Sequence, residues 1–153
     1  METYLPCLYA ALTSTGFAMV FELRRWQHIL AASFAGAAGW LVYLLTEDAM
    51  GVVGRNFMAT VAVALLAEIF ARVFKAPATV FLITGIIPIV PGGGLYYTMD
   101  ALIDGDMALF AQRGIEAAAI AGAIAAGSSL VSSVVRILPK RKRMPAAGTE
   151  KQS

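Results

Sequence analysis

The sequence has little charge, one cysteine and one histidine, and each shortage excludes a class of protein. Only 14% of its 153 residues are charged and 59% are hydrophobic, whereas soluble domains have roughly 25% and 45–50%. The lone Cys7 excludes a disulfide framework within the chain and a cysteine-based metal cluster. With a single histidine, His28, the sequence also lacks the usual metal set of an enzyme. We therefore expect neither a soluble globular fold nor an enzyme, and no metal or cofactor.

Long runs without Asp, Glu, Lys or Arg make up most of the chain. There are five such runs, and four of them hold 19 to 24 residues. They cover residues 3–21, 26–46, 56–67, 76–99 and 117–135. About 20 helical residues cross the roughly 30 Å of bilayer hydrocarbon, and the short third run reaches that length only by including Glu68 and Arg72. The sequence therefore predicts an all-α polytopic membrane protein with about five transmembrane helices.

Basic residues are distributed unevenly between the loops. With five crossings, ten of the 12 Lys and Arg residues fall on one side of the membrane, and Arg55 and Arg113 on the other. The positive-inside rule then places the N-terminus outside and the C-terminus in the cytoplasm. Four crossings with one re-entrant run would destroy this separation. We expect one transmembrane domain over residues 1–139 and a basic, disordered cytoplasmic tail over 140–153. Basic residues confined to membrane loops do not favour nucleic-acid binding.

Helix boundaries can be predicted around these runs. We expect helices over about residues 4–23, 29–45, 52–74 and 107–139, and an interrupted helix within 75–99. Two of them are rich in small residues. In the last helix one row is Ala118, Gly122 and Ala126, and another is Ala119, Ala123 and Gly127. Such rows allow close helix packing or line a water-filled path. They are also compatible with a homo-oligomer.

The run over residues 76–99 carries the strongest helix-breaking signal. Pro88 and Pro91 have no N–H to donate to the carbonyls four residues earlier, and three glycines follow them. The sequence therefore predicts that the fourth helix breaks at Pro88 and Pro91. Hydrocarbon tolerates such a break only where protein packs over it or where water and substrate line it. Discontinuous helices form the substrate sites of many secondary transporters. A plain kink followed by an outer turn is the alternative.

A broken transporter helix would bring specific groups to the substrate. The candidate substrate-path residues are Thr84, Pro88, Pro91, Gly92, Gly93 and Tyr96. The glycines would let a ligand approach the backbone, and the hydroxyl groups would supply hydrogen bonds. A phosphate-binding loop is disfavoured, because no Lys-Ser or Lys-Thr pair follows the glycines.

Glu68 is the acidic residue that hydropathy does not place in a loop. It precedes Arg72 by one helical turn, so the two side chains can pair at the membrane interface. Alternatively, Glu68 is an intramembrane carboxylate that binds a proton or a substrate amine, because ionisable groups at membrane depth are usually functional. It is the candidate for proton coupling.

Three short segments carry a family resemblance. They are Ala67-Glu68, Pro77-Ala-Thr-Val-Phe, and Ile-Ile-Pro88-Ile-Val-Pro91-Gly92. Together they are similar to the threonine/serine exporter family, and the chain resembles the small membrane component of its split, two-chain type. The resemblance implies a proton-coupled secondary exporter in the bacterial inner membrane. It implies a small polar substrate, either threonine and serine or a dicarboxylate such as succinate, and a larger partner subunit. A scaffold subunit that stabilises such a partner without transporting is the alternative.

Overall fold

The protein is all-helical in the part that the computed structural model describes, residues 5–137. No strand occurs in this range, so the predicted all-α class is confirmed. The elements are α1 (Leu5–Val20), α2 (Trp26–Leu45), α3 (Val52–Phe74), α4 (Ala78–Ile86), the 3-10 turn η2 (Ile87–Ile89), α5 (Gly92–Ile103) and α6 (Met107–Ile137). The predicted tail over 140–153 and the predicted domain boundary at 139 lie outside the described residues.

Helix ends follow local backbone signals. α3 covers the predicted range, and Lys75 closes it with a φ of 53°, the left-handed conformation that often ends helices. α1 is shorter than the predicted 4–23 because Glu22 adopts a φ of 55°. The N–H of Leu23 then donates to the Ala18 carbonyl at 3.1 Å. This turn ends α1 and leads the chain into α2, which begins three residues earlier than predicted.

Three helices, α2, α3 and α6, are long and apolar enough to cross a membrane. The segment from α4 through η2 and the following α5 pass the same test together, but they are bent by 50° at the break. α1 has 16 residues, or about 24 Å of helix, which is less than the roughly 30 Å of hydrocarbon. The described residues thus hold three candidate spans, or four if the bent pair is one span. Five crossings stay a prediction.

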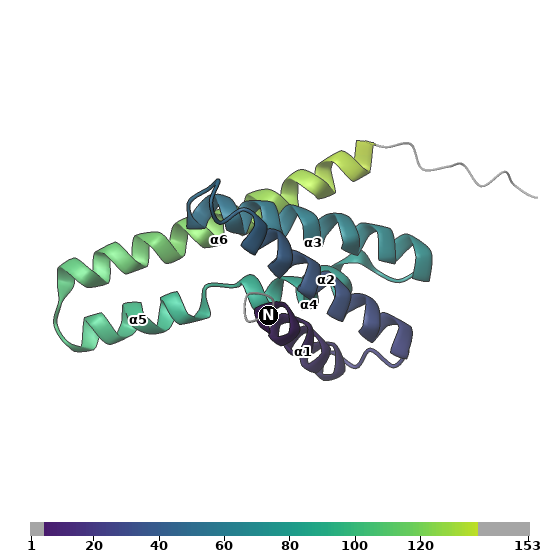
Figure 1. Ribbon diagram of the computed structural model, residues 1–153, viewed down its shortest axis with the longest axis horizontal. Coiled ribbons are helices and arrows are strands. Elements are labelled where there is room, and N and C mark those ends of the chain that lie inside the picture. Colours follow the sequence, from purple (N-terminus) through teal and green to yellow (C-terminus); the bar gives the residue numbers. More distant parts are fainter. Residues whose placement is uncertain (1–4, 138–153) are drawn as a thin grey trace, which may run out of the picture.

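The helices form a packed body with a projecting hairpin (Figure 1). In the body, α2 packs against α1, α3 and α4, and α3 also packs against α4 and α6. α5 packs mainly against α6, and together with the first half of α6 it extends away from the body. η2 lies where the body and the hairpin meet, in contact with α1, α2, α3 and α4.

Small residues bring the helices of the body close together, as predicted for α2. A Cβ atom added at Gly36 would collide with Ser14 of α1, and one added at Gly39 would collide with Val63 of α3. On α6, a Cβ at Gly127 would lie 3.1 Å from the Phe57 carbonyl oxygen. The row of α6 that includes Ala123 and Gly127 therefore packs against α3. The row of Ala118, Gly122 and Ala126 is exposed.

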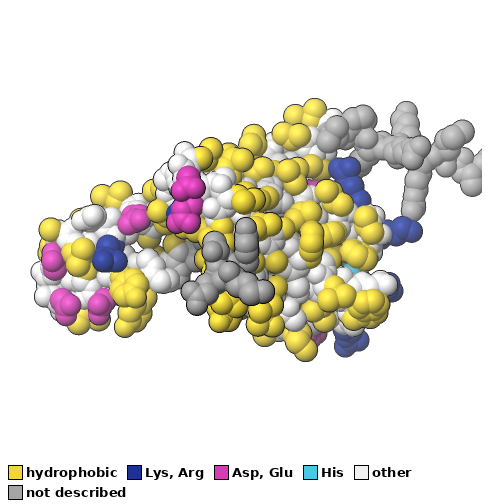
Figure 2. All heavy atoms as spheres, in the orientation of Figure 1, with side chains coloured by type: hydrophobic (Ala, Val, Ile, Leu, Met, Phe, Trp, Pro, Cys, Tyr) yellow, Lys and Arg dark blue, Asp and Glu magenta, His cyan; other side chains and the backbone are white. Residues whose placement is uncertain are grey.

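The two ends of the molecule differ in charge (Figure 2). Acidic side chains gather over the hairpin of α5 and α6, where Asp100, Asp104 and Asp106 lie. Most basic side chains lie at the opposite end, in the α1–α2 and α3–α4 loops and at the end of α6. The charge separation predicted from the loops therefore exists in the folded molecule.

Candidate functional site

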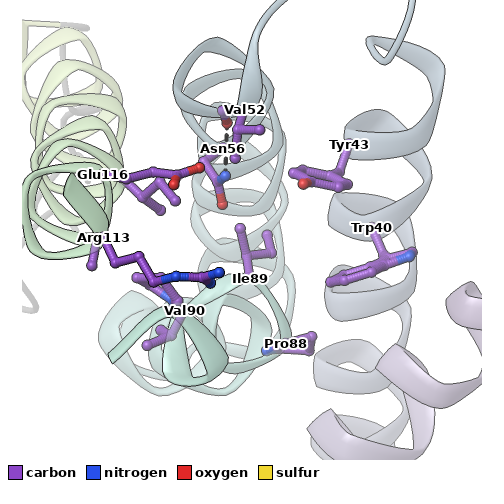
Figure 3. A pocket seen from close by; sticks show the side chains of 13 residues that line it. Trp40, Tyr43, Val52, Asn56, Pro88, Ile89, Val90, Arg113 and Glu116 are labelled. Carbon is purple, nitrogen blue, oxygen red and sulfur yellow. Dashed lines mark hydrogen bonds between the residues drawn. The ribbon is translucent and has the colours of Figure 1, made fainter. Parts of the chain in front are cut away.

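A cavity of about 280 Å³ opens beside the helix break, between α2, α3, α5 and α6 (Figure 3). Its lining residues are Trp40, Tyr43, Val52, Asn56, Pro88, Ile89, Val90, Pro91, Gly94, Arg113, Glu116, Ala117 and Ile120. Most of the wall is apolar, with a few polar and charged side chains directed into it. This composition is typical of small-molecule sites.

The break itself forms one wall of the cavity. α4 ends at Ile86, η2 spans the next three residues, and the chain becomes α-helical again at Gly92, so the predicted interruption at Pro88 and Pro91 is confirmed. The N–H of Val90 donates to the carbonyls of Ile86 and Ile87 at 3.2 and 3.3 Å, which satisfies part of the exposed backbone. Ile89 is buried against α3 and anchors the turn. The two prolines are thereby held at the cavity.

Asn56 contributes a polar group from the second turn of α3. Its Nδ2 donates to the Val52 carbonyl at 2.8 Å, and the residue is only 3% exposed. In Figure 3 its amide oxygen points into the cavity, and this oxygen has no hydrogen-bond partner within residues 5–137. Asn56 thus offers a fixed, unused acceptor to a ligand.

Arg113 and Glu116 bring opposite charges to the same cavity. They are three residues apart on α6, so they lie on one face of the helix, and in Figure 3 both side chains reach into the cavity. The Arg113 Cζ lies 5.3 Å from the ring centroid of Tyr97 on α5. Neither side chain forms an ion pair in the described part of the chain. A ligand could therefore meet a cation and an anion that do not neutralise each other.

Arg55 stabilises the rim of the cavity. Its Nη2 pairs with Glu47 Oε1 at 3.2 Å, its Nε donates to the Tyr43 carbonyl at 3.2 Å, and its Cζ lies 4.1 Å above the Tyr43 ring. These contacts join the end of α2 to the start of α3. They hold Tyr43 in the wall, and they leave little of the Arg55 charge free for a ligand.

A second cavity, of about 370 Å³, lies on the other side of Trp40 and Pro88, against α1. Its remaining wall comes from α1 and η2. The indole Nε1 of Trp40 is buried and has no hydrogen-bond partner among the described residues. Trp40 and Pro88 therefore form the partition between two cavities.

Only two of the six predicted substrate-path residues line the cavity. Pro88 and Pro91 line the cavity. Thr84 is fully buried, and its hydroxyl donates to the Val80 carbonyl at 2.8 Å. The other three predicted residues are exposed and do not line the cavity: Gly92, Gly93 and Tyr96. Gly94 is the glycine that borders the cavity.

Glu68 lies away from the cavity, half-buried on α3. It follows Asn56 by 12 residues, or about 18 Å along the helix axis. The ion pair with Arg72, which was one of the two predicted alternatives, is not formed in the described part of the chain.

Sequence reasoning missed Asn56, Arg113 and Glu116 as site residues. It counted Arg113 only as a charge on the outer side of the membrane, within the helix predicted from residue 107, whereas α6 carries this residue into the cavity wall. One available signal was the three-residue spacing of Arg113 and Glu116 directly before an uncharged run. The polar Asn56 at the start of the short third run was another.

Comparisons with known proteins agree with the family resemblance. The family described as "Threonine/Serine exporter, ThrE" matches residues 6–134. A protein of Corynebacterium glutamicum described as "Threonine/serine exporter" is 29% identical over 146 residues, which cover 94% of this chain and 28% of that relative. This chain thus spans little more than a quarter of the length of that relative. No solved structure matches this chain. Because the family match covers most of the chain, the protein belongs to the threonine/serine exporter family.

Proposed function

We propose that this protein is a membrane subunit of a secondary exporter of small polar metabolites, and that the substrate passes through the cavity at the helix break. Threonine and serine are the first candidate substrates, and a dicarboxylate such as succinate is the second. The observation that carries the proposal is the set of polar groups on Asn56, Arg113 and Glu116, which face one cavity where the hairpin meets the apolar helical body. Family membership supports the direction of transport.

The form of the cavity suits a small polar ligand. Its volume of about 280 Å³ is near the lower limit of small-molecule sites, about 300 Å³. Gly94, in the first turn of α5, borders it, and a helix N-terminus carries a partial positive charge that favours anions. Transporters with discontinuous helices use half-helix N-termini in this way. Pro88 and Pro91 line the proposed substrate path at the cavity. If the path extends beyond the cavity, it also includes Thr84, Gly92, Gly93 and Tyr96.

The basic end of the molecule is cytoplasmic in this proposal, in accordance with the positive-inside rule. The cavity lies towards the acidic end and then faces the outside of the cell membrane. If α1 also crosses, the N-terminus is outside and the C-terminus is in the cytoplasm. The segregated charges of Figure 2 support this orientation.

Proton coupling is assigned to Glu68. It lies within the candidate span α3, is half-buried and forms no ion pair in the described residues, and a lone carboxylate at membrane depth is usually functional. In Glu68→Gln, export driven by a pH gradient should be lost while the amount of protein in the membrane is unchanged. The rate of labelled serine efflux from vesicles at set pH gradients tests this. Unchanged efflux would remove Glu68 from the mechanism.

A larger partner subunit completes the exporter in this proposal. The chain corresponds to 28% of its relative in Corynebacterium glutamicum, and the exposed row of Ala118, Gly122 and Ala126 on α6 would let a partner helix approach closely. The same row supports the second candidate function, a scaffold subunit that stabilises a partner without transporting.

Efflux from living cells separates these functions. Cells producing this chain, a candidate larger subunit of the family, or both are preloaded with serine or threonine dipeptides, or with succinate. The proposal expects rapid efflux only with both chains, and collapse of efflux when the proton gradient is dissipated. Equal efflux from the larger subunit alone, at equal abundance, would establish the scaffold function.

A further inference from the structure

We propose that Arg113 and Glu116 form a two-point site for the charged backbone of an α-amino acid, in which Arg113 binds the carboxylate and Glu116 binds the ammonium group. The site rests on the proposed exporter function and names the pair of residues that selects the substrate class. It predicts that this chain prefers zwitterions to dicarboxylates.

The spacing of the two residues fits such a ligand. Residues three apart on a helix have Cβ atoms about 5–6 Å apart, and both side chains enter the same cavity. The carboxylate and ammonium groups of an α-amino acid are attached to one carbon atom, so one small ligand can reach both side chains. Arg113 and Glu116 do not pair with each other, and their charged atoms therefore remain available.

The surroundings of the two side chains fit opposite charges. Tyr97 lies beside the guanidinium of Arg113 and holds it at the wall. The N-terminal turn of α5 adds partial positive charge to the cavity at Gly94. In Figure 3, Glu116 reaches towards Asn56, whose free amide oxygen is a second acceptor. The carboxylate of the ligand thus meets donors, and its ammonium group meets acceptors.

The charge balance of the cavity separates the two substrate classes. Arg55 is near the rim, but Glu47 and Tyr43 already bind its guanidinium. Within residues 5–137, the lining therefore presents one available cation, Arg113, and one available anion, Glu116. Succinate has two carboxylates and no ammonium group, so its second carboxylate would face Glu116 and be repelled. The volume of the cavity would accept either ligand, and Glu116 is the residue that discriminates between them.

The test compares threonine with ligands that lack either its carboxylate or its ammonium group. The full chain is purified together with any partner that efflux requires, and binding of labelled threonine is measured in competition with threonine methyl ester, N-acetylthreonine and succinate. The wild-type protein should prefer threonine to each competitor by roughly tenfold to a hundredfold, the contribution of one charged hydrogen bond. In Arg113→Gln the preference over the ester should fall towards one. In Glu116→Gln the preference over N-acetylthreonine and succinate should fall instead.

Controls keep the outcome specific. Asp104→Asn removes an exposed acid from the same end of the molecule and should change no preference. If a neutral variant does not fold, Arg113→Lys and Glu116→Asp keep the charge and should keep most of the selectivity. An equal loss of affinity for all ligands in both variants would show a structural role and overturn the assignment. In the crossed pattern, Arg113→Gln changes only the preference over the ester, and Glu116→Gln changes only the preference over N-acetylthreonine and succinate. Export of threonine without this crossed pattern would overturn the assignment as well, leaving the exporter function intact. The crossed pattern without export would support the site and overturn the exporter function.

Discussion

The packed body and the cavity region differ in how their polar groups are bonded. In the body, two buried threonine hydroxyl groups bond to their own helix: Thr60 donates to the Asn56 carbonyl and Thr84 to the Val80 carbonyl, each at 2.8 Å. The buried Ser14 hydroxyl of α1 is an exception, with no partner among the described residues. In the cavity region, the Asn56 amide oxygen, Arg113 and Glu116 have no such partners in the described residues. A polar group left unsatisfied inside a protein costs free energy, and this cost applies to Asn56, which is only 3% exposed. Arg113 and Glu116 are exposed at the mouth of the cavity, where water or a ligand can reach their charges.

Glycines of the packed body and of the exposed row of α6 have different surroundings, and this difference gives the largest expected effect on stability. In the body, a Cβ at Gly85 would lie 2.7 Å from Val63 Cγ1 and 3.3 Å from Ala35 Cβ. One at Gly122 would meet no atom of another helix within 4 Å in the described part of the chain. Gly85→Ala should therefore separate α4 from α2 and α3 and destabilise the protein by about 1–3 kcal/mol. Gly122→Ala should be neutral, or stabilise by up to about 1 kcal/mol through helix propensity.

Thermal unfolding of the purified protein in detergent measures this difference. The two variants make the same chemical change in two helices, so they form a matched pair. If Gly85→Ala melted at the wild-type temperature, the close packing of α4 on α3 would be wrong. If Gly122→Ala lowered export without lowering the melting temperature, a partner helix on the exposed row of α6 would be indicated.

The same division shows what sequence reasoning could reach. The break at Pro88 and Pro91 follows from the missing N–H of proline, which is a local property. The range of α3 follows from the hydropathy of the third run once Glu68 and Arg72 are included. The proposed roles of Arg113 and Glu116 also depend on how α5 folds back along α6, and their three-residue spacing does not encode that helix pairing. Thr84 was predicted to face substrate, but its exposure depends on α2 and α3, which bury it.

The rim contacts of Arg55 give an intermediate effect, because they couple the body to the cavity. The Arg55 side chain is 11% exposed and its partner Glu47 is 58% exposed. Arg55→Gln should lose the ion pair, the hydrogen bond to the Tyr43 carbonyl and the contact with the Tyr43 ring, at a cost of about 1–2 kcal/mol. Glu47→Gln removes only an exposed charge and should cost less than about 1 kcal/mol.

Melting temperatures of the two rim variants, with substrate affinity, separate support from binding. We expect a clear drop for Arg55→Gln, and a weaker affinity because Tyr43 is no longer held in the cavity wall. Equal melting temperatures for both variants would mean that the ion pair alone accounts for the role of Arg55. In that case the contact with Tyr43 would contribute nothing to the rim.

The smallest effects are expected for two predicted path residues outside the cavity, and they define how far the substrate path extends. Thr84→Val replaces a buried hydroxyl that already bonds to its own helix, and Tyr96→Phe removes a hydroxyl from a side chain that is 67% exposed. Because neither hydroxyl reaches the cavity lining, both variants should export serine at the wild-type rate. Normalised efflux, measured beside Glu116→Gln, is the readout. A selective loss of export in Tyr96→Phe would extend the path along α5, out of the cavity and over the hairpin. A selective loss in Thr84→Val would instead require α4 to move away from α3 during transport, because only that motion would free its hydroxyl for substrate.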